Sequence, residues 1–182
     1  MTKKLSTHEL SLIGLMTAII CILGPLSFPL PISPVPISFT NLAIYITVFM
    51  LGWKKGSFSY LLYLLIGLIG IPVFSGFSGG IGKLAGPTGG YLLGFIFMAS
   101  ISGYFIERFP QKRGMAILGM ILGTIITYLF GTLWLSYQTN STFLQGLALG
   151  VFPFIPGDLA KIILASFLGP LLRHRLIQSH LI

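Results

Sequence analysis

Two ionisable residues lie three positions apart in one of the most apolar regions of the chain. They are Asp158 and Lys161, within FPFIPGDLAKIIL at residues 152–164. Ionisable groups inside an apolar span are costly, and by default they mark a ligand site or a transport pathway. A carboxylate beside an ammonium can offer one hydrogen-bond acceptor and one donor to a bound molecule. The alternative needs no ligand: Asp158 stabilises the first turn of a helix, and Lys161 is its salt-bridge partner.

The prolines just upstream decide where this pair lies on its helix. Pro153 and Pro156 argue against a continuous helix through 150–156, because proline lacks the N–H that a helix interior requires. Pro156 suits a first helical turn, where that N–H is not needed. We therefore predict that the helix proper runs from about 156 to 172, with both ionisable side chains on one face.

The composition indicates that the elements holding this pair are membrane helices. Of 182 residues, 54% are hydrophobic and only 8% are charged, whereas a soluble domain carries roughly 25% charged residues. Crossing a bilayer takes about 20 apolar helical residues, within a range of roughly 17–25. We predict one all-α domain, an integral membrane bundle of six helices. The predicted spans are at about 8–24, 40–53, 56–72, 89–106, 114–137 and 146–172.

The basic residues predict that the N- and C-termini are both cytoplasmic. With the N-terminus inside, nine of the eleven Lys and Arg residues fall on the cytoplasmic side, as the positive-inside rule requires. Lys161 lies within a span, and Lys83 alone is outside. The nine are Lys3, Lys4, Lys54, Lys55, Arg108, Lys112, Arg113, Arg173 and Arg175. This distribution accounts for the net charge of +8 without a nucleic-acid partner, since no basic stripe with interleaved aromatics is present.

Two segments predicted to be extracellular are expected to cover a pocket. Residues 25–39 contain five prolines and residues 71–90 contain seven glycines, so neither should be helical. Both are too apolar for an ordinary solvated loop. Irregular backbone at membrane depth must be buried in protein or line a cavity. The simplest inference is that both loops fold over the site that holds the Asp–Lys pair.

Residues in or next to these loops are candidate ligand contacts. Lys83, the one external cation, could bind an anionic group at the pocket mouth, and an ordinary solvated lysine explains it equally well. For the aromatic residues, core packing is the competing explanation. The further candidates are Tyr91, Thr40, Asn41, Ser78 and Phe74.

Catalysis finds little support in the sequence. Apart from His8 at the start of the first, the predicted spans contain no histidine, and they contain no HExxH motif and no second titratable group placed to share acid and base roles with Asp158. Metal-ligand clusters and phosphate-binding loops are also missing. We therefore predict that the chain is not an enzyme and holds no metal or cofactor of its own. If transport is active, a partner must supply the energy.

Four stretches resemble the BioY family, the biotin-binding S components of energy-coupling factor (ECF) vitamin transporters. The resemblance covers most of the chain, about 34–172. The stretches are PVPISFTN (34–41), GIPVFSGFSGGIGKLAGPTGGYLLGF (70–95), WLSYQTN (134–140) and FIPGDLAKIILA (154–165).

The resemblance implies a substrate-capture subunit in the bacterial plasma membrane. It would bind biotin from outside and deliver it inward with an ECF module, made of a transmembrane coupling protein and two ATPases. By position, Asp158 and Lys161 match the family's ligand-binding pair, and Tyr91 matches the tyrosine of GPTGGY. Biotin's ureido ring has N–H donors and a carbonyl acceptor, which complement a carboxylate and an ammonium.

Three positions depart from the family pattern. Thr40 stands where most members have Gln, Ser78 where some have Asn, and Leu92 where some have Arg. An arginine there would pair with the valerate carboxylate of biotin, so Lys83 is the substitute candidate. These departures leave another small vitamin-like substrate open.

The first predicted span carries small residues that suit helix docking. Gly14 and Ala18 lie four positions apart, a spacing that lets another helix approach closely. The resemblance implies that this face meets the coupling protein, and packing within the bundle is the alternative. Two other functions stay open: a solitary biotin facilitator without ATPases and, with least support, an intramembrane enzyme acting on a lipid-like substrate.

Overall fold

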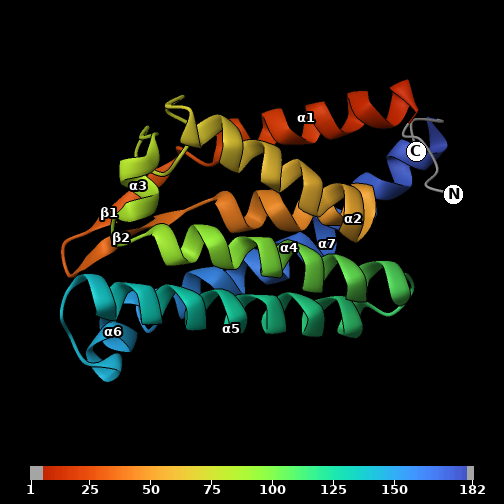
Figure 1. Cartoon of the computed structure of the whole chain (residues 1–182). Coiled ribbons are helices and arrows are strands. Elements are labelled where there is room, and N and C mark those ends of the chain that lie inside the picture. The colour runs from red at the N-terminus through yellow and green to blue at the C-terminus, as the bar shows by residue number, and fades with distance from the viewer. Residues whose placement is uncertain (1–5, 180–182) are drawn as a thin grey trace, which may run out of the picture.

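The computed structural model describes residues 6–179, which form a bundle of long helices. Within these residues, seven helices and one β hairpin follow in the order α1, β1, β2, α2, α3, α4, α5, α6 and α7. The hairpin, α3 and α6 gather at one end of the bundle, and the connection between α4 and α5 lies at the opposite end (Figure 1). The all-α bundle predicted from the sequence is confirmed, with the hairpin as an addition.

Three helices are long and apolar enough to cross a membrane by themselves. They are α4 (Gly89–Arg108), α5 (Arg113–Gln138) and α7 (Ile155–Gln178). The apolar helix α1 (Thr7–Leu23) is shorter. It begins with a capping box, in which Ser6 Oγ accepts the N–H of Glu9 at 3.2 Å and Glu9 Oε2 accepts the N–H of Ser6 at 2.9 Å.

The helix α2 (Thr40–Leu68) consists of two segments joined by a sharp break. Gly52 has φ 75° and ψ −178°, a conformation that is essentially restricted to glycine. The carboxylate of Glu107 accepts the N–H of Trp53 at 3.1 Å and thereby caps the second segment. The sequence placed a division between two spans at 52–56, and the structure has its break at Gly52.

The region of the last predicted span contains two helices. The helix α6 (Phe143–Gly150) is followed by a turn at 151–154, and α7 then begins with Pro156 in its first turn. The interruption lies where the prolines predict it. This turn brings the start of α7, with its ionisable pair, to the hairpin end of the bundle.

The segment expected to be an irregular loop at 25–39 contains a β hairpin. Strands β1 (Ser27–Leu30) and β2 (Ser33–Ser38) pair antiparallel, with Ser27 opposite Ser38. Proline is tolerated here because both strands of a two-stranded sheet are edges, where alternate N–H groups point away from the partner. In the second segment, 71–90, the short helix α3 (Ile81–Ala85) was also not anticipated.

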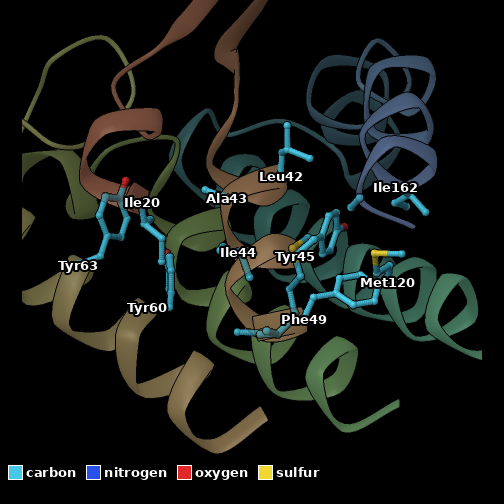
Figure 2. Close-up of a cluster of buried hydrophobic side chains, with 14 of the residues drawn as sticks. Ile20, Leu42, Ala43, Ile44, Tyr45, Phe49, Tyr60, Tyr63, Met120 and Ile162 are labelled. Atoms are coloured by element: carbon cyan, nitrogen blue, oxygen red, sulfur yellow. The ribbon is translucent and has the colours of Figure 1, made fainter. Parts of the chain in front are cut away.

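The core lies where both segments of α2 meet α1, α4 and α5. Tyr60 and Tyr63 from the second segment lie near Ile20, while Tyr45 and Phe49 from the first segment lie near Met120 (Figure 2). Two of these buried tyrosines have hydrogen-bonded hydroxyls: Tyr45 bonds Thr124 Oγ1 at 2.6 Å, and Tyr60 donates to the Leu92 carbonyl at 2.7 Å. The core therefore fixes the first segment of α2, from which two cavity residues project.

Candidate functional site: a buried ion pair in an apolar cavity

A narrow cavity lies among β2, the start of α2, α4, α5 and α7. Its volume is about 60 Å³ when measured with a water-sized sphere, which is room for a few water molecules. Asp158 and Lys161 line it from the first turns of α7. The feature that the sequence singles out is thus part of the wall of a cavity at the hairpin end.

The carboxylate of Asp158 accepts hydrogen bonds from three different elements. Its Oδ1 accepts from Asn41 Nδ2 on α2 at 2.8 Å and from Lys161 Nζ on α7 at 3.0 Å. Its Oδ2 accepts from the hydroxyl of Tyr128 on α5 at 2.6 Å. A carboxylate that is largely removed from solvent needs such donors, because an unpaired buried charge is strongly unfavourable.

The ammonium of Lys161 is held from two sides. Besides its bond to Asp158, its Nζ donates to the backbone carbonyl of Ser38 at 2.7 Å. Ser38 is the last residue of β2, so the lysine ties the hairpin to α7. Only 10% of the Lys161 side chain and 12% of the Asp158 side chain are exposed. The pair is therefore largely removed from solvent.

The network leaves hydrogen-bonding capacity unused at both partners. A carboxylate has about four acceptor positions, and three are occupied, two at Oδ1 and one at Oδ2. A lysine has three N–H donors, and two of those of Lys161 are occupied. The pair thus keeps about one acceptor position at Oδ2 and one donor position at Nζ that no protein group uses.

The rest of the wall is mostly apolar and aromatic. It includes Val35, Leu92, Phe95, Met98 and Phe154. Tyr91 also lines the cavity, and its hydroxyl donates to the carbonyl of Gly150 at 2.9 Å. A Cβ added at Gly131 would lie 2.2 Å from the Tyr91 ring. Glycine is therefore required there so that α5 can approach this tyrosine.

The structure brings five of the eight predicted contact residues to the cavity. The five are Asp158, Lys161, Tyr91, Thr40 and Asn41. The other three, Ser78, Phe74 and Lys83, do not line it. Phe74 is fully buried against Tyr63, with ring centroids 5.5 Å apart, and Ser78 Oγ donates to the carbonyl of Ser75 at 2.8 Å. Their predicted role in ligand binding stays a prediction.

Lys83 lies on α3, five residues before the cavity residue Thr88. Its carbonyl accepts a hydrogen bond from Thr88 Oγ1 at 3.5 Å, and Thr88 lines the cavity. Partial burial lowers the pKa of the Lys83 ammonium below its usual range. The lysine is therefore beside the cavity and carries a charge that neighbouring apolar groups make less favourable.

Sequence reasoning missed the hydroxyl that completes the carboxylate network. Tyr128 is an aromatic residue within the largely apolar run of α5, and nothing in the neighbouring sequence indicates that its hydroxyl bonds a carboxylate. It lies 30 residues from Asp158 along the chain. Its role depends on how α5 packs on α7, which no local pattern reveals. Ser38 was also missed, because it contributes a backbone carbonyl.

The small residues on α1 face away from the bundle. Gly14 and Ala18 are exposed, and a Cβ added at Gly14 would meet nothing within 4 Å. Packing within the described part of this chain therefore does not require a glycine at position 14. The face is open to lipid or to another protein.

Comparisons with known proteins agree with this fold. The family model described as the BioY family matches residues 1–178. The chain is 38% identical over 162 residues to the biotin transporter BioY2 of Lactococcus lactis subsp. cremoris, covering 89% of this chain and 88% of the relative. It is 37% identical over 177 residues to the biotin transporter BioY of Rhizobium etli, covering 91% and 92%.

A solved structure extends the match to three dimensions. The crystal structure at 2.1 Å of the S-component for biotin from an ECF-type ABC transporter has a TM-score of 0.86 and 33% identity. The match covers 94% of this chain and 95% of that chain. Together with the apolar helices, these findings show a multi-pass membrane protein that belongs to the BioY family.

Proposed function

We propose that this chain is the substrate-capture (S) subunit of an ECF transporter and that its ligand is biotin. The observation that carries the proposal is the buried pair of Asp158 and Lys161, with spare hydrogen-bonding capacity, in an apolar cavity of a BioY family member. A capture subunit binds its ligand and releases it unchanged, so no catalytic group is required.

The ureido ring of biotin fits the unused positions of the pair. One ureido N–H can donate to the free position at Asp158 Oδ2, and the ureido carbonyl can accept the free N–H of Lys161. The fused bicycle then contacts apolar wall residues such as Phe95 and Met98. The cavity has room for only a few water molecules, so we expect its walls to separate when the ligand enters.

We propose Lys83 as the partner of the valerate carboxylate. Leu92 supplies no charge where some family members carry arginine, and none of the other basic residues in the described part of the chain lies in α3 or the loops beside it. Lys83 is next to the wall residue Thr88. Ser78 and Phe74 are retained as proposed contacts only for a cavity that has opened.

The proposed partners are a transmembrane coupling protein and two ATPases, which would use ATP on behalf of this chain. We propose cytoplasmic termini in a bacterial plasma membrane, because the positive-inside rule favours that orientation. The exposed face of α1 at Gly14 and Ala18 is the proposed contact with the coupling protein. Small side chains there would let a partner helix approach closely.

Equilibrium binding of biotin to the purified protein in detergent tests the capture function. We expect Asp158→Asn and Lys161→Met to weaken binding more than tenfold, because losing one partner of a desolvated charged pair costs about 2–5 kcal/mol. Lys54→Met removes a lysine at the opposite end of the bundle and should bind like wild type. Recovered biotin should be chemically unchanged.

Three results would count against this proposal. Binding that both pocket variants leave intact would reduce the pair to a structural ion pair. Wild-type protein that binds a different vitamin and not biotin would retain the S-subunit role but reject the ligand. Conversion of biotin to another compound would reject the capture role itself.

Gly14→Leu tests the docking face separately from ligand binding. An added Cβ at position 14 meets nothing within 4 Å, so biotin affinity should stay unchanged and thermal stability should be equal or slightly higher. Co-purification with the coupling protein and ATPases should be lost. Leu15→Ala, a change to an exposed residue beside it, should keep the complex. Intact assembly with leucine at position 14 would place the contact elsewhere.

A further inference from the structure

A second hollow, at the end of the bundle opposite the cavity, has a markedly different charge. This hollow, which we call the basic groove, lies between the α4–α5 connection and the C-terminal half of α7 and has a volume of about 480 Å³. Four basic side chains line it: Lys112, Arg113, Arg173 and His174. No acidic residue lines it within the described part of the chain.

The acidic residues of the chain are engaged elsewhere. Glu9 forms an ion pair with Lys55 at 2.7 Å, and Glu107 accepts the N–H of Trp53. Asp158 belongs to the cavity. Among residues 6–179, no acidic side chain therefore forms an ion pair with the basic side chains of the groove, which leaves their charge available to an anion from outside.

Two of the arginines are held in place by the fold. Arg113 Cζ lies 4.6 Å from the centroid of the Phe167 ring on α7, a cation–π contact. Arg173 Nη1 donates to the carbonyl of Phe49 at 3.2 Å, which leaves its other N–H groups available. Preorganised guanidinium groups suit phosphate oxygens, because their planar donor arrangement matches phosphate geometry.

The remainder of the groove is apolar. Its floor includes the buried side chains of Phe49, Ile106 and Ala116. Beside it, Phe167 and Leu171 of α7 are exposed on a helix that is long enough to span a membrane. Basic side chains at the end of spanning helices, next to an apolar floor, lie at the depth of lipid headgroups.

We propose that the basic groove binds the headgroup of an anionic phospholipid, with an acyl chain along its apolar floor. Basic pockets between membrane helices are suited to anionic headgroups. A lipid satisfies both halves of the groove, since its phosphate meets the basic side chains and its chain meets the floor. An acidic protein segment would satisfy the charge alone, and it is the competing outcome of the test.

Native mass spectrometry of the purified protein, titrated with phosphatidylglycerol or phosphatidylcholine, tests the proposal. The test variant is Lys112→Gln with Arg113→Gln. Its control is Lys54→Gln with Arg175→Gln, which removes the same charge at the same end from residues that do not line the groove. Each basic residue near a lipid surface contributes about 1 kcal/mol, so we expect roughly thirtyfold weaker phosphatidylglycerol binding in the test variant. The control should match wild type.

Two outcomes would overturn the proposal. Equal affinity for the two lipids in wild type would show that the groove does not select an anionic headgroup and would favour an acidic protein segment. An equal loss in both double variants would indicate general charge attraction. Lys112→Gln alone, which leaves the Arg113–Phe167 contact intact, gives a smaller loss of the same kind if the double variant fails to fold.

Discussion

The two ends of this bundle use charge in opposite ways. At the cavity end, Asp158 and Lys161 are nearly buried, and each is bonded to groups from other elements. At the opposite end, basic residues outnumber acidic ones, and the one ion pair found there in the described residues is about one-third exposed. At the cavity end, the charged side chains are therefore bonded by groups of the protein itself. At the opposite end, most basic side chains are available to bind other molecules.

The comparison predicts that removing a lysine side chain causes a large loss of stability at the cavity end and a small one at the opposite end. Breaking a buried ion pair by removing one partner costs about 3–5 kcal/mol, and an exposed substitution costs within about 0.5 kcal/mol. Lys161→Ala should fall at the lower end, because Asn41 and Tyr128 still bond the carboxylate. Unfolding in detergent would be followed by thermal or denaturant titration, with Lys54→Ala as the control.

A second substitution sharpens this prediction. Adding Asp158→Asn to Lys161→Ala removes the unpaired charge, so the double variant should recover part of the lost stability. Equal stability of Lys161→Ala and Lys54→Ala would instead show that the two ends do not differ in this respect.

Tyr128→Phe tests how much of the organisation depends on one hydroxyl. A hydrogen bond to a charged group contributes roughly 1.5–3 kcal/mol, so we expect a loss of stability in that range. Biotin affinity should fall as well, because Oδ2 of Asp158 is then less firmly oriented. Tyr137→Phe is the matched control, since Tyr137 is 80% exposed. Wild-type values for Tyr128→Phe would remove this tyrosine from the site.

At the opposite end, the carboxylate of Glu107 lies directly against the backbone at Gly52. A Cβ added at Gly52 would lie 2.5 Å from Glu107 Oε2, at a φ that side chains rarely adopt. Such backbone conformations cost about 1–3 kcal/mol, and Gly52→Ala should destabilise the protein by that amount. Gly14→Ala, in open helix, should be neutral or slightly stabilising. Equal melting temperatures for the two variants would contradict the role of the break.

Local patterns in the sequence were sufficient for the features that depend on neighbouring residues. The Asp158–Lys161 pair follows from a spacing of three on one helix, and the turn before α7 follows from Pro153 and Pro156. The break at Gly52 follows from the stretch GWKKG at 52–56, in which two glycines and two lysines interrupt an apolar run. In each case the physical cause lies within one or two helical turns.

Features that depend on distant elements were not accessible in the same way. Asn41 and Tyr128 reach Asp158 across 117 and 30 residues of chain. The apolar character of 25–39 suggested that this segment covers the cavity. Its five prolines indicated an irregular loop, so the pairing of β1 with β2 was not predicted. Similarly, Phe74 was a candidate ligand contact with core packing as the alternative, and in this structure it packs against Tyr63. Aromatic residues give no local signal that separates these roles.

Lys83→Gln gives the smallest expected effect. It tests whether the Lys83 ammonium, at the cavity end, pairs with the carboxylate of the ligand. Lys83 is partly exposed, so pairing with a ligand carboxylate should contribute at most about 1 kcal/mol, or about fivefold in affinity. Biotin should therefore bind up to fivefold more weakly to this variant, while biotin amide, which lacks the carboxylate, should bind equally to both proteins. Burial lowers the pKa of Lys83, so its ammonium loses its proton at a lower pH than an ordinary lysine does. The preference of the wild type for biotin over biotin amide should therefore disappear below the pH at which an ordinary lysine loses its charge. If Lys83→Gln keeps the wild-type preference for biotin over biotin amide, another group binds the biotin carboxylate. In that case Lys83 would not be a charge at the cavity end that binds an external partner.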